Sequence, residues 1–167
     1  MTKEVKRNYL EICSIQDFKE VNQPSSNYSL NLLDPINFQL NKFFYKNIGQ
    51  NHKWLDRLVW TESQWINYVS CKNVKTYIFK HKEDLVGFFE LILHHDKKEV
   101  EIAYFGLLEE YQNKKLGSYL LSEAIKKSFV NSINRVWVHT CSLDHKNALD
   151  NYIARGMKIF KTEIIKV

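Results

Sequence analysis

Glycine and proline are scarce in this sequence, with five and two residues among 167. Long flexible linkers usually need more of both residues, and no internal repeat or low-complexity tract interrupts the chain. We therefore expect residues 1–167 to form a single domain that is large enough to bury a hydrophobic core.

Long apolar runs and cysteine pairs are also missing. No run of about 18 apolar residues occurs, which argues against a membrane-spanning helix, and the charged residues 1–7 argue against a signal peptide. The three cysteines, Cys13, Cys71 and Cys141, are odd in number and widely spaced. This pattern predicts free thiols in a reducing compartment such as the cytoplasm, and no metal site.

Positive charge is in modest excess, with a formal net charge of +5. Such a balance fits a nucleic-acid or membrane partner, an anionic small cofactor, or simple solubility. The lysines are scattered along the chain, and the predicted strands carry Val, Ile and Phe in core-like patterns. We therefore expect neither a nucleic-acid nor a membrane partner.

The first part of the chain predicts one strand followed by a helix. Residues 5–12 show partial alternation and predict a strand, whereas residues 22–34 are rich in Asn and Ser and predict a loop. Asp34 and Pro35 fit the cap and first turn of a helix, and Gly49 fits its end.

Aromatic residues are frequent in the stretch that follows. A short helical piece is predicted over residues 54–59, and another helix from Thr61, where Thr61 and Gln64 fit a capping box. The aromatic side chains are interpreted as core, with a wall of an acceptor pocket as the alternative. The pocket candidates are Tyr45, Trp54, Trp60 and Trp65.

Beyond residue 74 the pattern changes to short extended runs. These predict a hairpin over residues 75–80 and 85–93, then a strand, a helix from Leu116, a strand, a helix capped by Asp144 and stopped by Gly156, and a last strand. The order predicts a mixed α/β domain with a mostly antiparallel, twisted sheet of six to seven strands. A β-α-β unit lies in its middle, and about four helices flank it.

The junction between Leu107 and Leu120 carries the clearest chemical signal. A helix start leaves backbone N–H groups unpaired and holds phosphates well. Gly117 lets a ligand approach the backbone, and Lys114 and Lys115 add positive charge. The junction therefore predicts a seat for a pyrophosphate.

Residues 104–118 resemble the acetyl-CoA loop of the GNAT N-acetyltransferase superfamily, whose pattern is Q/R-x-x-G-x-G/A. Gln112 fills the first position and Gly117 the last, whereas Lys115 replaces the central glycine. If that position needs a positive φ, lysine costs about 1 kcal/mol or more there. The lysine offers an added cation to the phosphates in return.

Residues 140–157 resemble a later motif of the same family, N-x-x-A-x-x-x-Y-x-x-x-G-[FM] in loose form, with Asn147, Tyr152, Gly156 and Met157 in place. The resemblance covers roughly residues 75–165, the expected acetyl-CoA-binding core. Residues 1–74 match only in layout, as a strand and acceptor-side helices.

The resemblance implies an N-acetyltransferase that transfers an acetyl group from acetyl-CoA to a primary amine by direct attack within a ternary complex. It implies Tyr152 as the catalytic acid and Glu101 as the base, with Glu90 and His139 as competitors. Main chain of the strand before the loop would pair with the pantetheine arm, with Gly106 as the residue of a local bulge. The cofactor-binding residues it implies are Phe105, Gly106, Leu107, Leu108, Gln112, Asn113, Lys114, Lys115, Leu116, Gly117, Ser118, Asn147 and Tyr152.

Other interpretations stay open at this point. Tyr152 also fits a helix core residue and Glu101 a solvent-facing strand residue. A CoA-binding regulatory module that has lost catalysis is the alternative to an enzyme. A phosphate-loop nucleotidase is set aside because Lys115 is followed by leucine. The sequence specifies neither which amine, of a small molecule or of a peptide, is the acceptor, nor whether the chain forms a homodimer.

Overall fold

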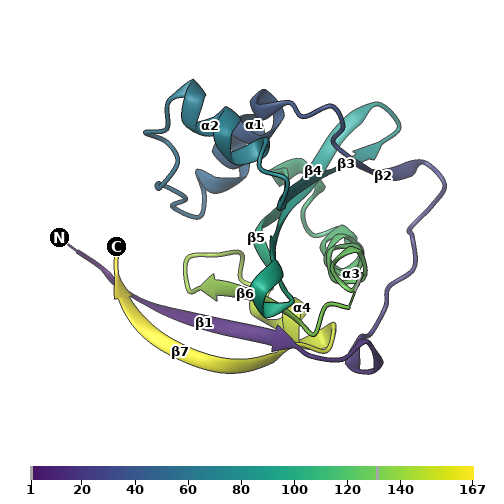
Figure 1. Ribbon diagram of the computed structural model, residues 1–167, viewed down its shortest axis with the longest axis vertical. Helices are drawn as coiled ribbons and strands as arrows, with labels where there is room; N and C mark the ends of the chain where they lie inside the picture. The colour runs from purple at the N-terminus through teal and green to yellow at the C-terminus, as the bar shows by residue number, and fades with distance from the viewer. Residues whose placement is uncertain (1, 131) are drawn as a thin grey trace.

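The computed structural model describes residues 2–130 and 132–167, so Met1 and Asn131 of the expected domain lie outside the described residues. One seven-stranded sheet runs through the molecule in the order β2-β3-β4-β5-β6-β1-β7 (Figure 1). The strands are β1 (Glu4–Ile12), β2 (Tyr28–Leu32), β3 (Val74–His81), β4 (Asp84–His94), β5 (Glu99–Leu107), β6 (Arg135–Cys141) and β7 (Lys158–Lys166). The α-helices are α1 (Phe38–Gly49), α2 (Glu62–Val69), α3 (Leu116–Ser128) and α4 (Ala148–Ala154).

Only β5 and β6 pair in parallel, and they are joined by α3. All the other neighbouring strands are antiparallel. The mixed α/β class, the mostly antiparallel sheet and the central β-α-β unit predicted from the sequence are therefore confirmed.

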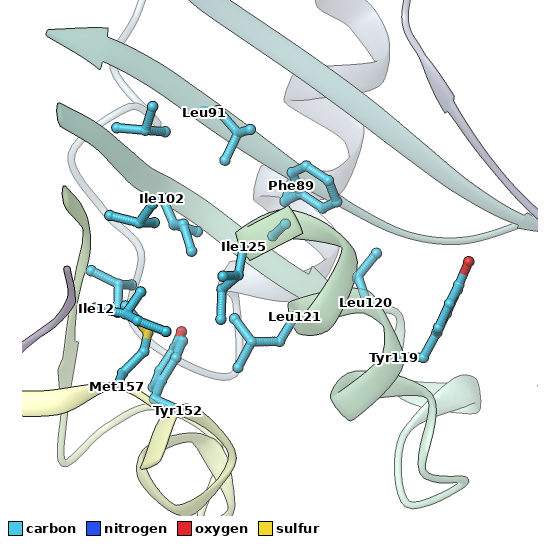
Figure 2. Close-up of a cluster of buried hydrophobic side chains, with 14 of the residues drawn as sticks. Ile12, Phe89, Leu91, Ile102, Tyr119, Leu120, Leu121, Ile125, Tyr152 and Met157 are labelled. Carbon is cyan, nitrogen blue, oxygen red and sulfur yellow. The ribbon is translucent and has the colours of Figure 1, made fainter. Parts of the chain in front are cut away.

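Two hydrophobic clusters lie on opposite faces of the sheet. The larger one packs α3 against the sheet through Leu120, Leu121 and Ile125, which are fully buried. Figure 2 shows this cluster, with Tyr152 and Met157 at the end nearest α4. The smaller cluster lies under α1, where Phe44 stacks on Phe88 of β4.

The strand β1 lies between β6 and β7 and is antiparallel to both. Side chains alternate along it: Leu10 and Ile12 enter the larger core, whereas Arg7 and Tyr9 face the other way. The first and last strands are thus neighbours in the sheet, and the Lys3 N–H donates to the Val167 carbonyl at 2.9 Å.

Several local predictions are confirmed. The turn between β3 and β4 closes the predicted hairpin, and α3 begins at Leu116. Thr61 and Gln64 form the predicted capping box. Gly156 has a φ of +106°, and a Cβ there would lie 2.0 Å from the Asp17 carbonyl oxygen, so only glycine fits this helix stop.

Two predictions for residues 22–37 are wrong. Residues 28–32 form the edge strand β2, which pairs with β3. These residues do alternate, with Tyr28, Leu30 and Leu32 between the polar Ser29 and Asn31, but the run is only five residues long and follows a stretch rich in Asn and Ser, which favoured a loop. Helix α1 starts at Phe38, after Asp34 and Pro35, because the Asn37 side chain caps it by accepting from the Gln39 N–H at 3.1 Å.

Two helix predictions also fail. Residues 54–59 form turns, and Leu55, Leu58 and Val59 are exposed rather than on a buried stripe. Asp144 does not cap α4, which begins at Ala148. Its carboxylate instead accepts from the Thr140 hydroxyl at 2.5 Å and the Cys141 N–H at 2.9 Å, and so closes the turn after β6.

Candidate active site

The site arises where β5 and β6 stop pairing. Their parallel register covers only Glu99–Glu101 against Arg135–Trp137, and beyond it the two strands diverge. Backbone groups of β5 on the side that faces β6 are therefore left without a strand partner over Ile102–Leu107. The gap joins the two faces of the sheet at its centre.

The bulge predicted at Gly106 lies at Ala103 instead. Glu90 pairs with Tyr104 and Leu91 with Ile102, so Ala103 has no partner on β4. Gly106 is paired with Phe88 within the regular ladder. Glycine is needed there for a different reason, because a Cβ would lie 2.7 Å from the Ile48 Cγ2 atom of α1.

A cavity of about 730 Å³ fills the gap. Its walls come from β5, β6, the start of α3, α4, β1, β7 and the loop between α1 and α2. This volume suits a ligand of cofactor size. The predicted cofactor residues that line it are Phe105, Gly106, Leu107, Gln112, Asn113, Lys115, Gly117, Ser118, Asn147 and Tyr152.

Three predicted cofactor residues lie outside the lining. Leu108 and Leu116 are buried in the two cores, where leucine packs rather than contacts a ligand. The Lys114 ammonium lies 5.5 Å from the centre of the Tyr111 ring, on the outer side of the loop.

The amino end of α3 forms one end of the cavity. Lys115 is the residue before the helix, with φ 62° and ψ 14°, and no side chain caps the first turn. Asn113 also has a positive φ of 61°. The first N–H groups of α3 are thus left for a ligand, and this end of the helix carries partial positive charge.

Gly117 faces the cavity in that first turn. A Cβ there would meet its nearest protein atoms, Asn151 Nδ2 and Leu107 Cδ1, at 3.8 Å, an ordinary contact distance. The surrounding protein therefore leaves room for a side chain at this position.

Two side-chain amides hold the loop. The Gln112 Nε2 atom donates to the Leu107 carbonyl at 3.2 Å and so ties the loop to the end of β5. The Asn151 Nδ2 atom donates to the Gly117 carbonyl at 3.1 Å and joins α4 to α3. Sequence analysis missed Asn151, since nothing in a single sequence marks an amide that bonds to main chain 34 residues away.

Tyr152 projects from α4 into the cavity and is only 6% exposed. Burial raises the pKa of its phenol, and the nearby Asp144 carboxylate raises it further. The hydroxyl is therefore protonated at neutral pH and can donate a proton. Asn147, just before α4, also lines the cavity, and its N–H donates to His145 Nδ1 at 3.2 Å.

The three candidate bases lie in different environments. Glu90 is fully buried and accepts from Arg57, Tyr68 and Asn41 at 2.8–2.9 Å, so it cannot reach the cavity. Glu101 is not a lining residue, and its Oε2 atom lies 3.3 Å from the His94 Nε2 atom.

His139 of β6 lines the cavity directly. It is exposed to the open space, yet the walls around it limit hydration and lower the pKa of its imidazole, and the positive charge of Arg7 lowers it further. The ring is therefore neutral at pH 7 and can accept a proton.

Of the aromatic pocket candidates, only Trp54 lines the cavity. Tyr45, Trp60 and Trp65 instead surround the guanidinium of Arg57, with its Cζ atom 4.7–5.7 Å from their ring centres. Arg57 pairs with Glu90 at 2.9 Å. Sequence analysis missed this buried pair because the two residues come from a turn and a strand 33 residues apart.

The described residues contain no cluster of three or more His, Cys, Asp or Glu side chains that could hold a metal ion. Within the same residues, no helix is long and apolar enough to cross a membrane.

The family assignment rests on the sequence as well as on this geometry. The model of the GNAT acetyltransferase family matches residues 37–157. The chain belongs to this family, whose members use acetyl-CoA. No curated protein matches the sequence.

Solved structures of this family share the fold. The chain resembles a GCN5-related N-acetyltransferase from Sphaerobacter thermophilus with a TM-score of 0.73 and 13% identity, over 99% of this chain and 52% of that one. A GCN5-related N-acetyltransferase from Kribbella flavida gives 0.68 and 13%, over 95% and 56%. The chain thus spans about half the length of these two proteins. An aminoglycoside acetyltransferase from an uncultured soil metagenomic sample gives 0.65 and 11%, over 80% and 90%.

Proposed function

We propose that this chain is an N-acetyltransferase that transfers an acetyl group from acetyl-CoA to a primary amine within a ternary complex. One observation carries the proposal: a single cavity joins the uncapped start of α3, the Tyr152 hydroxyl region and His139. A phosphate seat, a proton donor and a proton acceptor are thus open to the same space.

In this proposal the pyrophosphate of acetyl-CoA lies at the first turn of α3, near Gly117 and Lys115. The pantetheine arm follows the unpaired side of β5, where main-chain groups between Ala103 and Leu107 bind it as an added strand. The thioester then reaches the middle of the sheet, close to Tyr152.

The amine nitrogen attacks the carbonyl carbon of the thioester, and the carbon–sulfur bond breaks as the tetrahedral intermediate collapses. Tyr152 donates its phenolic proton to the leaving sulfur. An unpaired N–H of β5 stabilises the oxyanion. The amine loses its proton to a base on the acceptor side.

Glu101, the base implied by the resemblance, would act through water because it does not line the cavity. His139 lines it and is neutral at pH 7, which favours direct acceptance of the proton. We therefore propose His139 as the immediate acceptor and Glu101 as a nearby negative charge that favours its protonated form.

The alternative of a non-catalytic CoA-binding module rested on Lys115. Its backbone has the positive φ that glycine would supply, so the loop keeps its path despite the substitution. This observation supports a loop that can still bind acetyl-CoA, and it favours a catalytic acetyltransferase over a non-catalytic module.

Tyr152→Phe tests the proposal most directly. The ring keeps its packing and only the hydroxyl is lost, so we expect kcat to fall about 100-fold with little change in CoA affinity or stability. Thiol release from acetyl-CoA over a panel of amines measures the rate, and calorimetry measures CoA binding. Tyr77→Phe is the matched control, because Tyr77 stacks on Phe89 away from the cavity. A full rate in Tyr152→Phe would exclude Tyr152 as the acid.

The pH dependence of kcat identifies the base. The pKa of His139 lies below its usual value of 6.5, so the wild-type rate should hold above that pH and fall only as more acidic solutions protonate the ring. His139→Gln should remove this acid limb and lower the plateau about tenfold or more. If Glu101→Gln removes the limb and His139→Gln does not, Glu101 is the base.

A further inference from the structure

Arg7 places in the cavity a cation that forms no ion pair among the described residues. It projects from β1, in the interior of the sheet, and lines the cavity. Its Nε atom is buried without a hydrogen-bond partner among the described residues. No ion pair within residues 2–130 and 132–167 includes Arg7.

The carboxylate opposite Arg7 in the sheet is already engaged by other donors. Glu163 lies opposite Arg7 in the β1–β7 register. Its two oxygens accept from the Tyr9 hydroxyl at 2.6 Å and the Lys161 ammonium at 3.0 Å. An arginine left beside occupied carboxylates keeps its planar array of donors for a ligand.

Asp144, the carboxylate at the end of β6, is engaged as well. It accepts from the Thr140 hydroxyl and the Cys141 N–H, which fixes it in the turn. The protein therefore presents Arg7 to the cavity without neutralising it there.

Arg7 lies on the acceptor side of the cavity. It pairs with Cys141 across β1 and β6, and it points to the same face of the sheet as Tyr9, whose ring lies 5.6 Å from that of His139. Since Tyr9 is paired with His139 in the same register, Arg7 and His139 project from neighbouring positions of adjacent strands. The start of α3 lines the same cavity from another element, where the Gly117 carbonyl accepts from Asn151 of α4.

We propose that Arg7 binds a carboxylate of the acceptor, so that the substrate is an amine that also carries a carboxylate, such as an amino acid or a peptide with a free carboxyl end. This inference rests on the proposed acetyltransferase function. A guanidinium matches a carboxylate with two parallel N–H···O bonds, and it orients the ligand as well as attracting it. The strand β1 is paired with a neighbouring strand on both sides, so it gives the Arg7 guanidinium a rigid attachment.

A carboxylate in the cavity lining complements the positive charge of Arg7. Asp56, in the loop between α1 and α2, is an exposed carboxylate in the lining, and no ion pair in the described part of the chain includes it. Tyr104 and His139 line the same cavity. Arg155 and Asp150 also line the cavity without an ion pair among the described residues, but Arg7 and Asp56 are the pair that lie with His139 and Tyr104 in the lining. A cation and an anion that are both left unpaired suit an acceptor that arrives as a zwitterion.

Matched acceptors test this inference. Amino acids and their amides, which keep the amine and lose only the carboxylate, are compared by thiol release with the full chain. We expect wild type to favour the acids by about tenfold or more in kcat/KM, the value of a charge-assisted pair. Arg7→Gln should lower kcat/KM for acids at least tenfold more than for amides, mainly through KM. Lys6→Gln, which removes the same charge from an exposed position of β1 outside the cavity lining, should not change the ratio.

Equal rates for acids and amides in wild type, or equal losses in Arg7→Gln, would overturn the inference. A loss of CoA affinity in Arg7→Gln would overturn it too, because Arg7 would then serve the cofactor. A second measurement does not need turnover. Calorimetric titration of N-acetylglycine and its amide into wild type should show tighter binding of the acid, and Arg7→Gln should abolish that preference.

Failure of the inference about Arg7 can be distinguished from failure of the acetyltransferase proposal. If the chain shows no affinity for CoA and no thiol release with any amine, the acetyltransferase proposal fails. The binding preference for N-acetylglycine then still tells whether Arg7 holds a carboxylate.

Discussion

The two proposed halves of the site use different groups of the chain, main-chain groups in one half and side chains in the other. The cofactor half, around β5 and α3, offers main-chain groups: an unpaired strand side, an uncapped helix start and a glycine. The proposed acceptor half, around α1 and α2, depends on side chains packed on one buried cation, Arg57. A main-chain site tolerates substitution at many positions, whereas a side-chain site fails when a central residue is lost.

Arg57 is the centre of the acceptor half. Its Cζ atom lies 4.1–5.7 Å from the centres of five aromatic rings, which come from α1, α2, β5 and the loop between the helices. Burial disfavours its charge, but the Glu90 carboxylate outweighs that effect and raises the pKa of Arg57 further. The pair thereby fixes the loop that carries Trp54 and Asp56 to the cavity.

Breaking this pair should have the largest effect. Arg57→Met leaves the Glu90 carboxylate buried and unpaired, so we expect unfolding to become easier by about 3–5 kcal/mol, measured by urea denaturation. CoA binding of the fraction that stays folded should persist, because Arg57 does not line the cavity and its ring contact on β5 is Tyr104, ahead of the loop at α3.

The double variant Arg57→Met/Glu90→Leu is the control for this prediction. Since it removes both charges, its loss of stability should be smaller than the loss in Arg57→Met alone. If the double variant is as unstable as the sum of both single variants, the pair does not act as a unit.

A substitution at Gly117 should affect the cofactor half without affecting stability. Gly117→Leu places a side chain over the proposed phosphate seat, while the protein around it has room for a Cβ. We expect CoA affinity to fall about tenfold or more with the unfolding free energy within about 0.5 kcal/mol of wild type. Gly117→Ala is the matched control and should keep most of the affinity. Unchanged affinity in Gly117→Leu would move the phosphate seat elsewhere.

The smallest expected effect is at Lys115. Lysine in the left-handed region costs about 1 kcal/mol, so Lys115→Gly should stabilise the protein by up to about that amount, less the greater freedom of glycine in the unfolded chain. Lys114, whose φ is not positive, provides the comparison: Lys114→Gly should not stabilise. Thermal denaturation measures the melting temperature of both variants, and equal shifts in the two would show that the Lys115 backbone is not strained.

The local structure of the proposed cofactor half could be predicted from the sequence because its signals are local. Gln112 and Gly117 lie within one loop, and the start of α3 follows from the apolar spacing after it. The strand–helix–strand order and the hairpin before it were equally readable, since each depends on alternation or on a turn within a few residues.

The acceptor half could not be predicted, because its contacts join distant segments. The apolar residues 54–59 have helical spacing, yet the burial of Arg57 against Glu90 sets the path of the chain there. Arg7 gave no signal either, since a charged residue in a short strand looks like any solvent-facing position until β6 and β7 enclose it. The bulge at Ala103 likewise depends on the register with β4, which no single strand specifies.

The position of β1 has a consequence for how the molecule assembles. Among the described residues, the backbone of residues 4–12 finds its hydrogen-bond partners in residues 136–142 and 158–166. Closing loops of such length is entropically costly and slows folding. We expect the segment from β3 to β6 to collapse first, and the insertion of the opening strand to be a late step that completes the wall bearing Arg7.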